Sequence, residues 1–147
     1  MLGPYYRLIV RSTCNKTITY NSGGRIEANW IPWKMEEGAM VQGSELSDTT
    51  AFLNTDESVV SGDVMPGTVI DNSQDMYIGF TGTFYGFFDS LLYSTYGLQL
   101  HLEQSTDNVR WPSDRDDFDF MKHTKILVHM FTSEISNDDC ALNFFFG

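Results

Sequence analysis

The sequence predicts an all-β protein, a single domain built as an antiparallel β-sandwich. Apolar and polar residues alternate with a period of two almost wherever a period can be read, which is typical of strands with one buried face. Stretches with the 3.6-residue period of a helix are scarce. The length of 147 residues and the 41% of hydrophobic residues fit one domain around one core.

The N-terminal part predicts a first strand and then a hairpin. Residues 5–11 alternate, which places Tyr6, Leu8 and Val10 on a buried face. A second run over 17–20 leads into a polar, glycine-containing turn at 21–24. Residues 25–30 form the returning strand, and we expect Pro32 to end it, because proline cannot donate to a sheet ladder.

Residues 34–58 are expected to form a long loop insertion with at most one helical turn. Helix-forming residues in the first half of this stretch are interrupted by Gly38 and Gly43, and their apolar spacing favours neither helix nor strand. Loops of this length are uncommon inside a compact domain and are often functional.

A glycine- and aromatic-rich strand is predicted over residues 79–88. Phe80, Gly82 and Phe84 fall on one face, while Thr81 and Tyr85 fall on the other. Glycines between aromatic residues leave room for rings or for the close approach of another backbone.

The C-terminal part predicts three further strands. Leucines at every second position give residues 97–103 the clearest amphipathic pattern of the chain, and residues 125–131 and 141–146 follow. Together these strands predict a core that contains Leu8, Val10, Leu98, Leu100, Leu102, Ile126 and Val128.

The charge distribution excludes several classes of function. The net charge is −11, and residues 35–109 carry twelve acidic side chains but no Lys or Arg. Such a chain is a poor partner for nucleic acid or for an anionic membrane, whose binding needs basic residues. We interpret the acidic segment as a solvated face, or as a surface that meets a cation.

Targeting signals are lacking in the sequence. No apolar run is long enough for a membrane-spanning helix, and the first ten residues do not have the pattern of a signal peptide. The sequence therefore predicts a cytoplasmic location by default, and action outside the cell at a target membrane is compatible with it.

Catalytic and metal-binding signals are weak. The three histidines lack the spacing of known hydrolase motifs, so we expect no enzymatic activity, no catalytic residue and no cofactor. Cys14 and Cys140 allow one disulfide but fit free, buried thiols equally well. Calcium is the one metal with candidate ligands, in an acidic run more typical of a solvated loop: Asp114, Asp116, Asp117 and Asp119.

Aromatic residues supply the candidate binding site. The chain holds 21 of them, and several stand in segments that we expect to join strands: Trp30, Trp33, Trp111, Tyr93 and Tyr96. Rings exposed on loops suit either a membrane interface or the apolar face of a sugar. The alternative is that these rings close the ends of the sandwich.

Short motifs follow one another over most of the chain: Leu8-Ile9-Val10, Asn15-Lys16-Thr17-Ile18, Trp30, Pro66-Gly67, Thr81-Gly82-Thr83-Phe84-Tyr85 and Gly97 to Asn108. In their order, these motifs resemble the aegerolysin family, within the wider group of actinoporin-like β-sandwiches. Thr81 stands where the family tends to have an acidic residue, and Glu103 to Asn108 replace its Trp- and Cys-containing segment, so lipid specificity does not transfer residue by residue.

Three functions follow as hypotheses. The resemblance implies a membrane-lipid-binding, toxin-like or defence protein, with a second, pore-forming protein as an optional partner. The aromatic residues fit a lectin-like, carbohydrate-binding sandwich as well. An all-β acidic chain also fits a subunit of a viral or structural assembly. A glycan array run against a panel of liposomes separates the first two.

Overall fold

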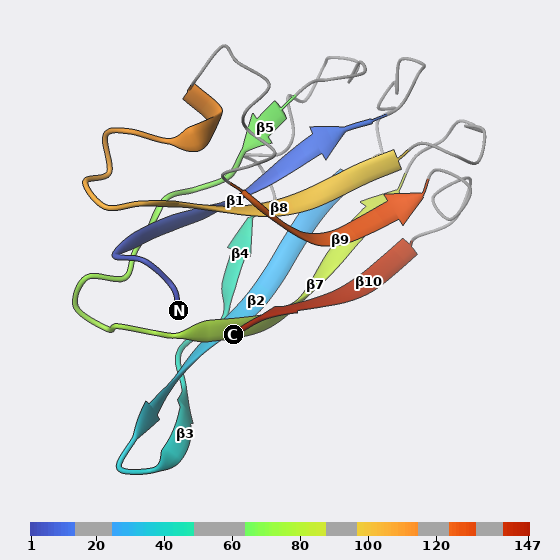
Figure 1. Cartoon of the computed structure of the whole chain (residues 1–147). Coiled ribbons are helices and arrows are strands. Elements are labelled where there is room, and N and C mark those ends of the chain that lie inside the picture. Colours follow the sequence, from blue (N-terminus) through green and yellow to red (C-terminus); the bar gives the residue numbers. More distant parts are fainter. Residues whose placement is uncertain (14–24, 49–63, 88–96, 115–123, 132–139) are drawn as a thin grey trace.

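Two antiparallel sheets stack face to face, which confirms the predicted all-β sandwich (Figure 1). The computed structural model describes residues 1–13, 25–48, 64–87, 97–114, 124–131 and 140–147. Sheet I has the order β5-β1-β8-β9, with β6 also paired to β1. Its strands are β1 (Tyr5–Ser12), β5 (Val64–Pro66), β6 (Ile70–Asp71), β8 (Gly97–Ser105) and β9 (Lys125–Phe131).

Sheet II has the order β10-β7-β2-β3, with β4 also paired to β2. A short 3₁₀ helix, η1 (Pro112–Asp114), follows β8 of the other sheet. The strands of sheet II are β2 (Arg25–Glu36), β3 (Ala39–Gln42), β4 (Leu46–Asp48), β7 (Gly79–Phe87) and β10 (Cys140–Phe146).

The core lies between the two sheets, as the alternation predicts. Leu8, Val10, Leu98, Leu100 and Leu102 of sheet I are buried there, opposite Phe80, Phe84 and Trp30 of sheet II. The Trp30 indole N–H donates to the Tyr6 hydroxyl at 3.3 Å, which joins the two sheets through the middle of the core. Burial raises the pKa of Tyr6.

Ile126 is not a core residue, and a β-bulge explains why. Leu100 pairs with Val128, but the next residue of β8, His101, pairs with Ile126, so Leu127 is the extra residue of β9. The bulge reverses the alternation. Val128 packs against the core, while Ile126 shares the outer face of sheet I with His101 and is 43% exposed.

Strand β2 continues through Pro32, contrary to the prediction that this residue ends it. The Pro32 carbonyl accepts a hydrogen bond from the Gly43 N–H at 2.8 Å, on the side of β2 where β3 has ended and β4 has not begun. In an antiparallel strand the nitrogen and the carbonyl of a residue face the same neighbour. The proline nitrogen therefore faces a gap in the ladder, where no donor is required.

The long loop expected over residues 34–58 is wrong for its described part, residues 34–48. Here β2 and β3 form a hairpin that projects beyond the sandwich, and β4 returns along β2 (Figure 1). The hairpin turns at Glu37 and Gly38, which both have positive φ, the geometry of a two-residue type I′ connection. An acidic residue at the first turn position hides this signal in the sequence.

Gly82 allows two large rings to share the core. It pairs with Trp30 on one side and with Phe144 on the other. A Cβ atom at this position would lie 2.6 Å from Phe144 Cζ and 2.7 Å from Trp30 Cβ. The predicted role of this glycine, to leave room for neighbouring rings, agrees with this packing.

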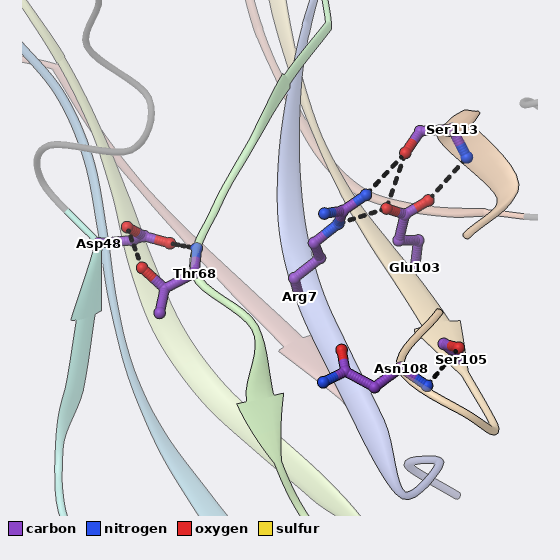
Figure 2. Close-up of polar contacts among 7 residues, drawn as sticks. All are labelled: Arg7, Asp48, Thr68, Glu103, Ser105, Asn108 and Ser113. Carbon is purple, nitrogen blue, oxygen red and sulfur yellow. Dashed lines mark hydrogen bonds and ion pairs between the residues drawn. The ribbon is translucent and has the colours of Figure 1, made fainter. Parts of the chain in front are cut away.

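Two polar residues, Asp48 and Asn72, hold the segments that cross from one sheet to the other. Asp48, at the end of β4, accepts hydrogen bonds from the Thr68 N–H at 2.6 Å and the Thr68 hydroxyl at 3.2 Å (Figure 2). Asn72 accepts from the Tyr77 N–H and donates to the carbonyls of Gly3 and Tyr77. These bonds fix the connection between β5 and β7.

Candidate functional site

The outer face of sheet II carries an ordered grid of side chains. Odd-numbered residues of β2 and β7 point away from the core, and the strand register aligns them across the sheet. One row is uncharged and polar throughout, and we call it the amide–hydroxyl row: Ser47, Asn29, Thr83 and Asn143. The strands β2, β7 and β10 thus present three hydrogen-bonding groups side by side, and Ser47 of β4 adds a fourth.

Apolar groups flank this row on both sides. On one side Tyr85 lies between Glu27 and Ala141, and on the other Thr81 lies between Ile31 and Phe145. Phe145 is 74% exposed, which is unusual for a phenyl ring on an ordered strand. The face therefore combines neutral hydrogen-bonding groups with exposed aromatic surface.

A shallow depression of about 690 Å³ lies over this grid. Its lining includes Asn29, Thr83 and Asn143 of the amide–hydroxyl row, together with Tyr85, Phe145 and Glu45. The Thr83 hydroxyl donates to Asn143 Oδ1 at 3.1 Å, so the amide is oriented by its neighbour. Its NH₂ group can still donate to a ligand.

Trp33 extends the face by one further row. It pairs with Gly79 at the start of β7, and its ring lies directly over the backbone of two glycines. A Cβ atom on Gly79 would lie 2.6 Å from Trp33 Cζ2, and one on Gly147 would lie 2.7 Å from the same atom. Because neither glycine has a side chain, the indole can pack closely against the backbone of the sheet.

Charge on this face is negative. Among the side chains that the structure describes in these rows, the charged ones are Glu27 and Glu45. Carboxylates accept hydrogen bonds from hydroxyl groups and repel phosphate and sulfate. The electrostatics therefore disfavour an anionic ligand and are compatible with one rich in hydroxyl groups.

A second polar cluster lies on the outer face of sheet I but is closed to ligands. Glu103 is fully buried and accepts from Arg7 Nε at 2.5 Å, from the Ser113 hydroxyl at 2.8 Å and from the Ser113 N–H at 2.9 Å (Figure 2). Arg7 Nη2 also donates to the Ser113 hydroxyl, and the guanidinium lies 4.3 Å from the Trp111 ring centroid. These groups satisfy one another, so the cluster anchors η1 to the sheet.

Two of the predicted binding tryptophans are not exposed. Trp30 is 1% exposed in the core, and Trp111 is 7% exposed beneath Arg7. The expectation of exposed loop rings is wrong for both, because β2 passes through Pro32 and because Arg7 covers Trp111. Trp33 lies on the outer face, and Tyr93 and Tyr96 lie outside the described residues.

The other candidate sites are described only in part. Of the calcium candidates, Asp114 is the last residue of η1, while Asp116, Asp117 and Asp119 lie outside the described residues. Cys14 of the cysteine pair also lies outside them. No cluster of three or more metal-binding side chains occurs in the described ranges. None of the helical residues in those ranges forms a span that is long and apolar enough to cross a membrane.

Asn29, Asn143, Phe145 and Glu45 are not among the site residues that the sequence predicts. The alternation over residues 79–88 shows that Thr81, Thr83 and Tyr85 share a face. It does not show which residues of β2 and β10 stand beside them, since that depends on a register set by residues far apart in the chain.

Comparison with known proteins gives no relative: no family model, no curated protein and no solved structure matches the chain. The resemblance to aegerolysins therefore stays a prediction.

Proposed function

We propose that the protein is a non-enzymatic glycan-binding protein and that the outer face of sheet II holds the sugar. The observation that carries the proposal is the amide–hydroxyl row between exposed aromatic groups, over a depression of about 690 Å³. Sugars offer hydroxyl groups at their edges and C–H bonds on their faces. Amides and hydroxyls match the former, and aromatic rings match the latter.

The site is pre-organised, which favours binding. Its side chains stand on paired strands rather than on loops, and Thr83 orients Asn143 through a hydrogen bond. Little conformational entropy is lost when such groups bind a ligand.

Simple binding fits the described lining better than hydrolysis does. Glycoside hydrolysis requires two carboxyl groups that flank the bond to be broken. Among the described lining residues, Glu45 supplies one, and the other carboxylate described on this face, Glu27, lies outside the lining. We expect no release of reducing sugar from any glycan that binds.

Membrane-lipid binding, with a pore-forming partner where one is needed, stays the competing proposal. Its original support is reduced because Trp30 and Trp111 are buried. One other observation favours it: Met35 and Met40 lie opposite each other on the projecting hairpin and are 52% and 60% exposed. Glu36 and Glu37 beside them oppose insertion into an anionic membrane.

A glycan array and a vesicle-sedimentation assay with phosphatidylcholine–sphingomyelin liposomes test the two proposals together. We expect glycan binding without vesicle binding. The Asn29→Ala/Asn143→Ala variant should lose at least about tenfold in affinity, the effect of about 1.4 kcal/mol. Gln74→Ala removes an exposed amide away from the face and serves as the matched control, with unchanged affinity.

The opposite pattern would overturn glycan binding. If the wild-type protein sediments with vesicles and binds nothing on the array, lipid is the ligand. If a glycan binds but the double variant binds it as tightly, the site lies elsewhere.

A further inference from the structure

We infer that the ligand is a neutral, β-linked oligosaccharide that spans two subsites, the amide–hydroxyl row and the indole of Trp33. This inference rests on the proposed function and specifies the class of glycan. The geometry that supports it is the position of Trp33 on the same face of β2 as Asn29, with Ile31 between them.

The Trp33 subsite is built by two glycines. Gly79 stands beside Trp33 in the ladder, and Gly147 follows the end of β10, so the ring lies over both of them. Any side chain at either position would meet the ring: the nearest ring atom, Cζ2, lies 2.6 Å from a Cβ on Gly79 and 2.7 Å from one on Gly147. The ring thereby packs against the backbone of both glycines and stays partly exposed, so a sugar can stack on it.

The distance between the subsites sets the length of the ligand. Asn29 and Trp33 are four residues apart on one strand, which corresponds to about 13 Å at roughly 3.3 Å per residue. One sugar ring does not cover this span. Ile31 and the exposed Phe145 fill the space between the two subsites and make the surface continuous.

The chemistry of the face restricts the type of sugar. Glu27 and Glu45 disfavour sulfated and acidic glycans, because like charges repel. Stacking on an indole needs a ring with a flat C–H face, and β-linked hexopyranoses with equatorial substituents have such faces on both sides. We therefore expect glucan- or chitin-type chains rather than charged polysaccharides.

A length series tests the inference. Isothermal titration calorimetry with cello-, laminari- and chito-oligosaccharides, from monomer to hexamer, should show affinity that rises at least tenfold between the dimer and the hexamer of the recognised series. Trp33→Ala should remove that gain. Asn143→Ala should weaken the binding of both ligands, and Met35→Ala, which removes an exposed side chain of the projecting hairpin, is the control.

Two further measurements test the inference even if the Trp33→Ala variant does not fold. Trp33→Tyr keeps a smaller ring on the glycines and should retain part of the gain with length. In the wild-type protein, the NMR signal of the Trp33 indole N–H should shift with the hexamer and stay in place with the dimer.

The outcomes separate the inference from the proposed function. If affinity does not depend on length, or if Trp33→Ala binds the hexamer like the wild type, the second subsite does not exist and glycan binding still stands. If none of the three series binds and the array is also negative, the proposed function fails, and this inference fails with it.

Discussion

Glu103 shows how a single buried carboxylate can organise the outer face of sheet I. Its side chain is fully buried, and it is matched by Arg7, which is 13% exposed, and by two donors of Ser113 (Figure 2). Removing one partner of such a pair leaves the other charge buried and uncompensated. Breaking the Arg7–Glu103 pair should therefore lower the free energy of unfolding by more than the intact pair contributes to it.

Glu103→Ala should lower the free energy of unfolding by about 3–5 kcal/mol, because Arg7 would lose its buried partner. Urea denaturation followed by far-UV circular dichroism measures the change. Glu36→Ala breaks the exposed ion pair with Lys34 and is the matched control, with little effect. Equal losses in the two variants would show that the Glu103 cluster is not the anchor described above.

His101 is a second buried polar residue, and it is neutral in the folded protein. Burial is the main cause that lowers its pKa to about 4, helped by the positive charge of Arg11 and by His129. Its Nδ1 faces the Thr124 hydroxyl and its Nε2 faces Gln99 Oε1, each at 3.1 Å. Because the Gln99 oxygen can only accept, Nε2 carries the proton.

The folded protein should therefore lose stability through His101 as the pH falls from about 6.5 to about 4. In this window the unfolded chain binds a proton that the folded protein does not bind, and the loss amounts to at most about 3 kcal/mol. Below pH 4 the contribution levels off. An NMR titration of the His101 ring should give a midpoint near pH 4, and a midpoint near 6.5 would contradict the burial argument.

At the scale of elements, β2 serves both faces of sheet II. Its even-numbered residues Ile26, Ala28 and Trp30 are in the core, while Asn29, Ile31 and Trp33 lie outside. The strand can do this only because it remains regular through Pro32. Its far end, beyond the sandwich, is held by the type I′ turn at Glu37 and Gly38.

Glu37→Asn should stabilise the hairpin. Glu37 has a φ of 50°, a left-handed conformation that costs most residues about 1–2 kcal/mol and that asparagine adopts more readily. We expect slower amide hydrogen exchange at Ala39 and Val41, whose N–H groups face β2, in the variant. Glu45→Asn makes the same chemical change outside the turn and should leave these rates as they are.

Gly82→Ala should destabilise the protein by about 1–3 kcal/mol or more, because the added methyl group meets Phe144, Trp30 Cβ and the Asn29 carbonyl. Gly3→Ala is the control, since its closest neighbour, Gln104 Oε1 at 3.3 Å, belongs to a flexible side chain. Chemical denaturation of both variants measures the difference. Similar stabilities would mean that the rings around Gly82 can move apart.

The alternation of residues was sufficient to predict β1, β7, β8, β9 and β10 and most of the core, but not β3, β4 or the second half of β2. Leu98, Leu100 and Leu102 are buried as expected, because period-two patterning is a local property. The prediction that Ile126 belongs to the core was wrong, because a β-bulge shifts the alternation of β9 by one residue. β-bulges have no dependable signal in the local sequence. The prediction that Trp30 is an exposed loop residue was wrong, because β2 continues through Pro32. The strand tolerates Pro32 because the proline nitrogen faces the gap between β3 and β4, which the local sequence does not show.

At the scale of the whole molecule, the net charge of −11 should affect the free energy of unfolding but not the proposed affinity for a glycan. Residues 35–109 have no Lys or Arg, and self-repulsion in such a segment is screened by salt. The candidate face offers hydrogen bonds and aromatic surface to a neutral ligand, and these respond weakly to ionic strength. The two properties should therefore be separable by salt.

Raising NaCl from about 0.02 M to about 0.5 M shortens the screening length several-fold. The free energy of unfolding should rise over this range, while glycan affinity should change less than about twofold. Calorimetric titrations and urea denaturation at matched salt concentrations measure the two quantities. An affinity that falls steeply with salt would indicate a charged ligand and would contradict the proposal of a neutral one.

The sequence could predict only one part of the candidate site. Trp33 was selected from its aromatic character and its neighbouring proline, and it lies on the outer face. The amide–hydroxyl row was not predictable, since Asn29, Thr83 and Asn143 come from three strands whose register is a property of the assembled sheet. Functional faces on sheets are in general non-local, and single-sequence patterns do not show them.

The different surroundings of the tryptophans also have an optical consequence. Trp30 is enclosed in the core and Trp111 lies beneath a guanidinium, whereas Trp33 is held at the surface by Gly79 and Gly147. The emission of the first two reports on unfolding, and the emission of Trp33 responds to anything that settles on its ring. The protein therefore carries an intrinsic fluorophore at its candidate site, so ligands can be screened by fluorescence with no added label.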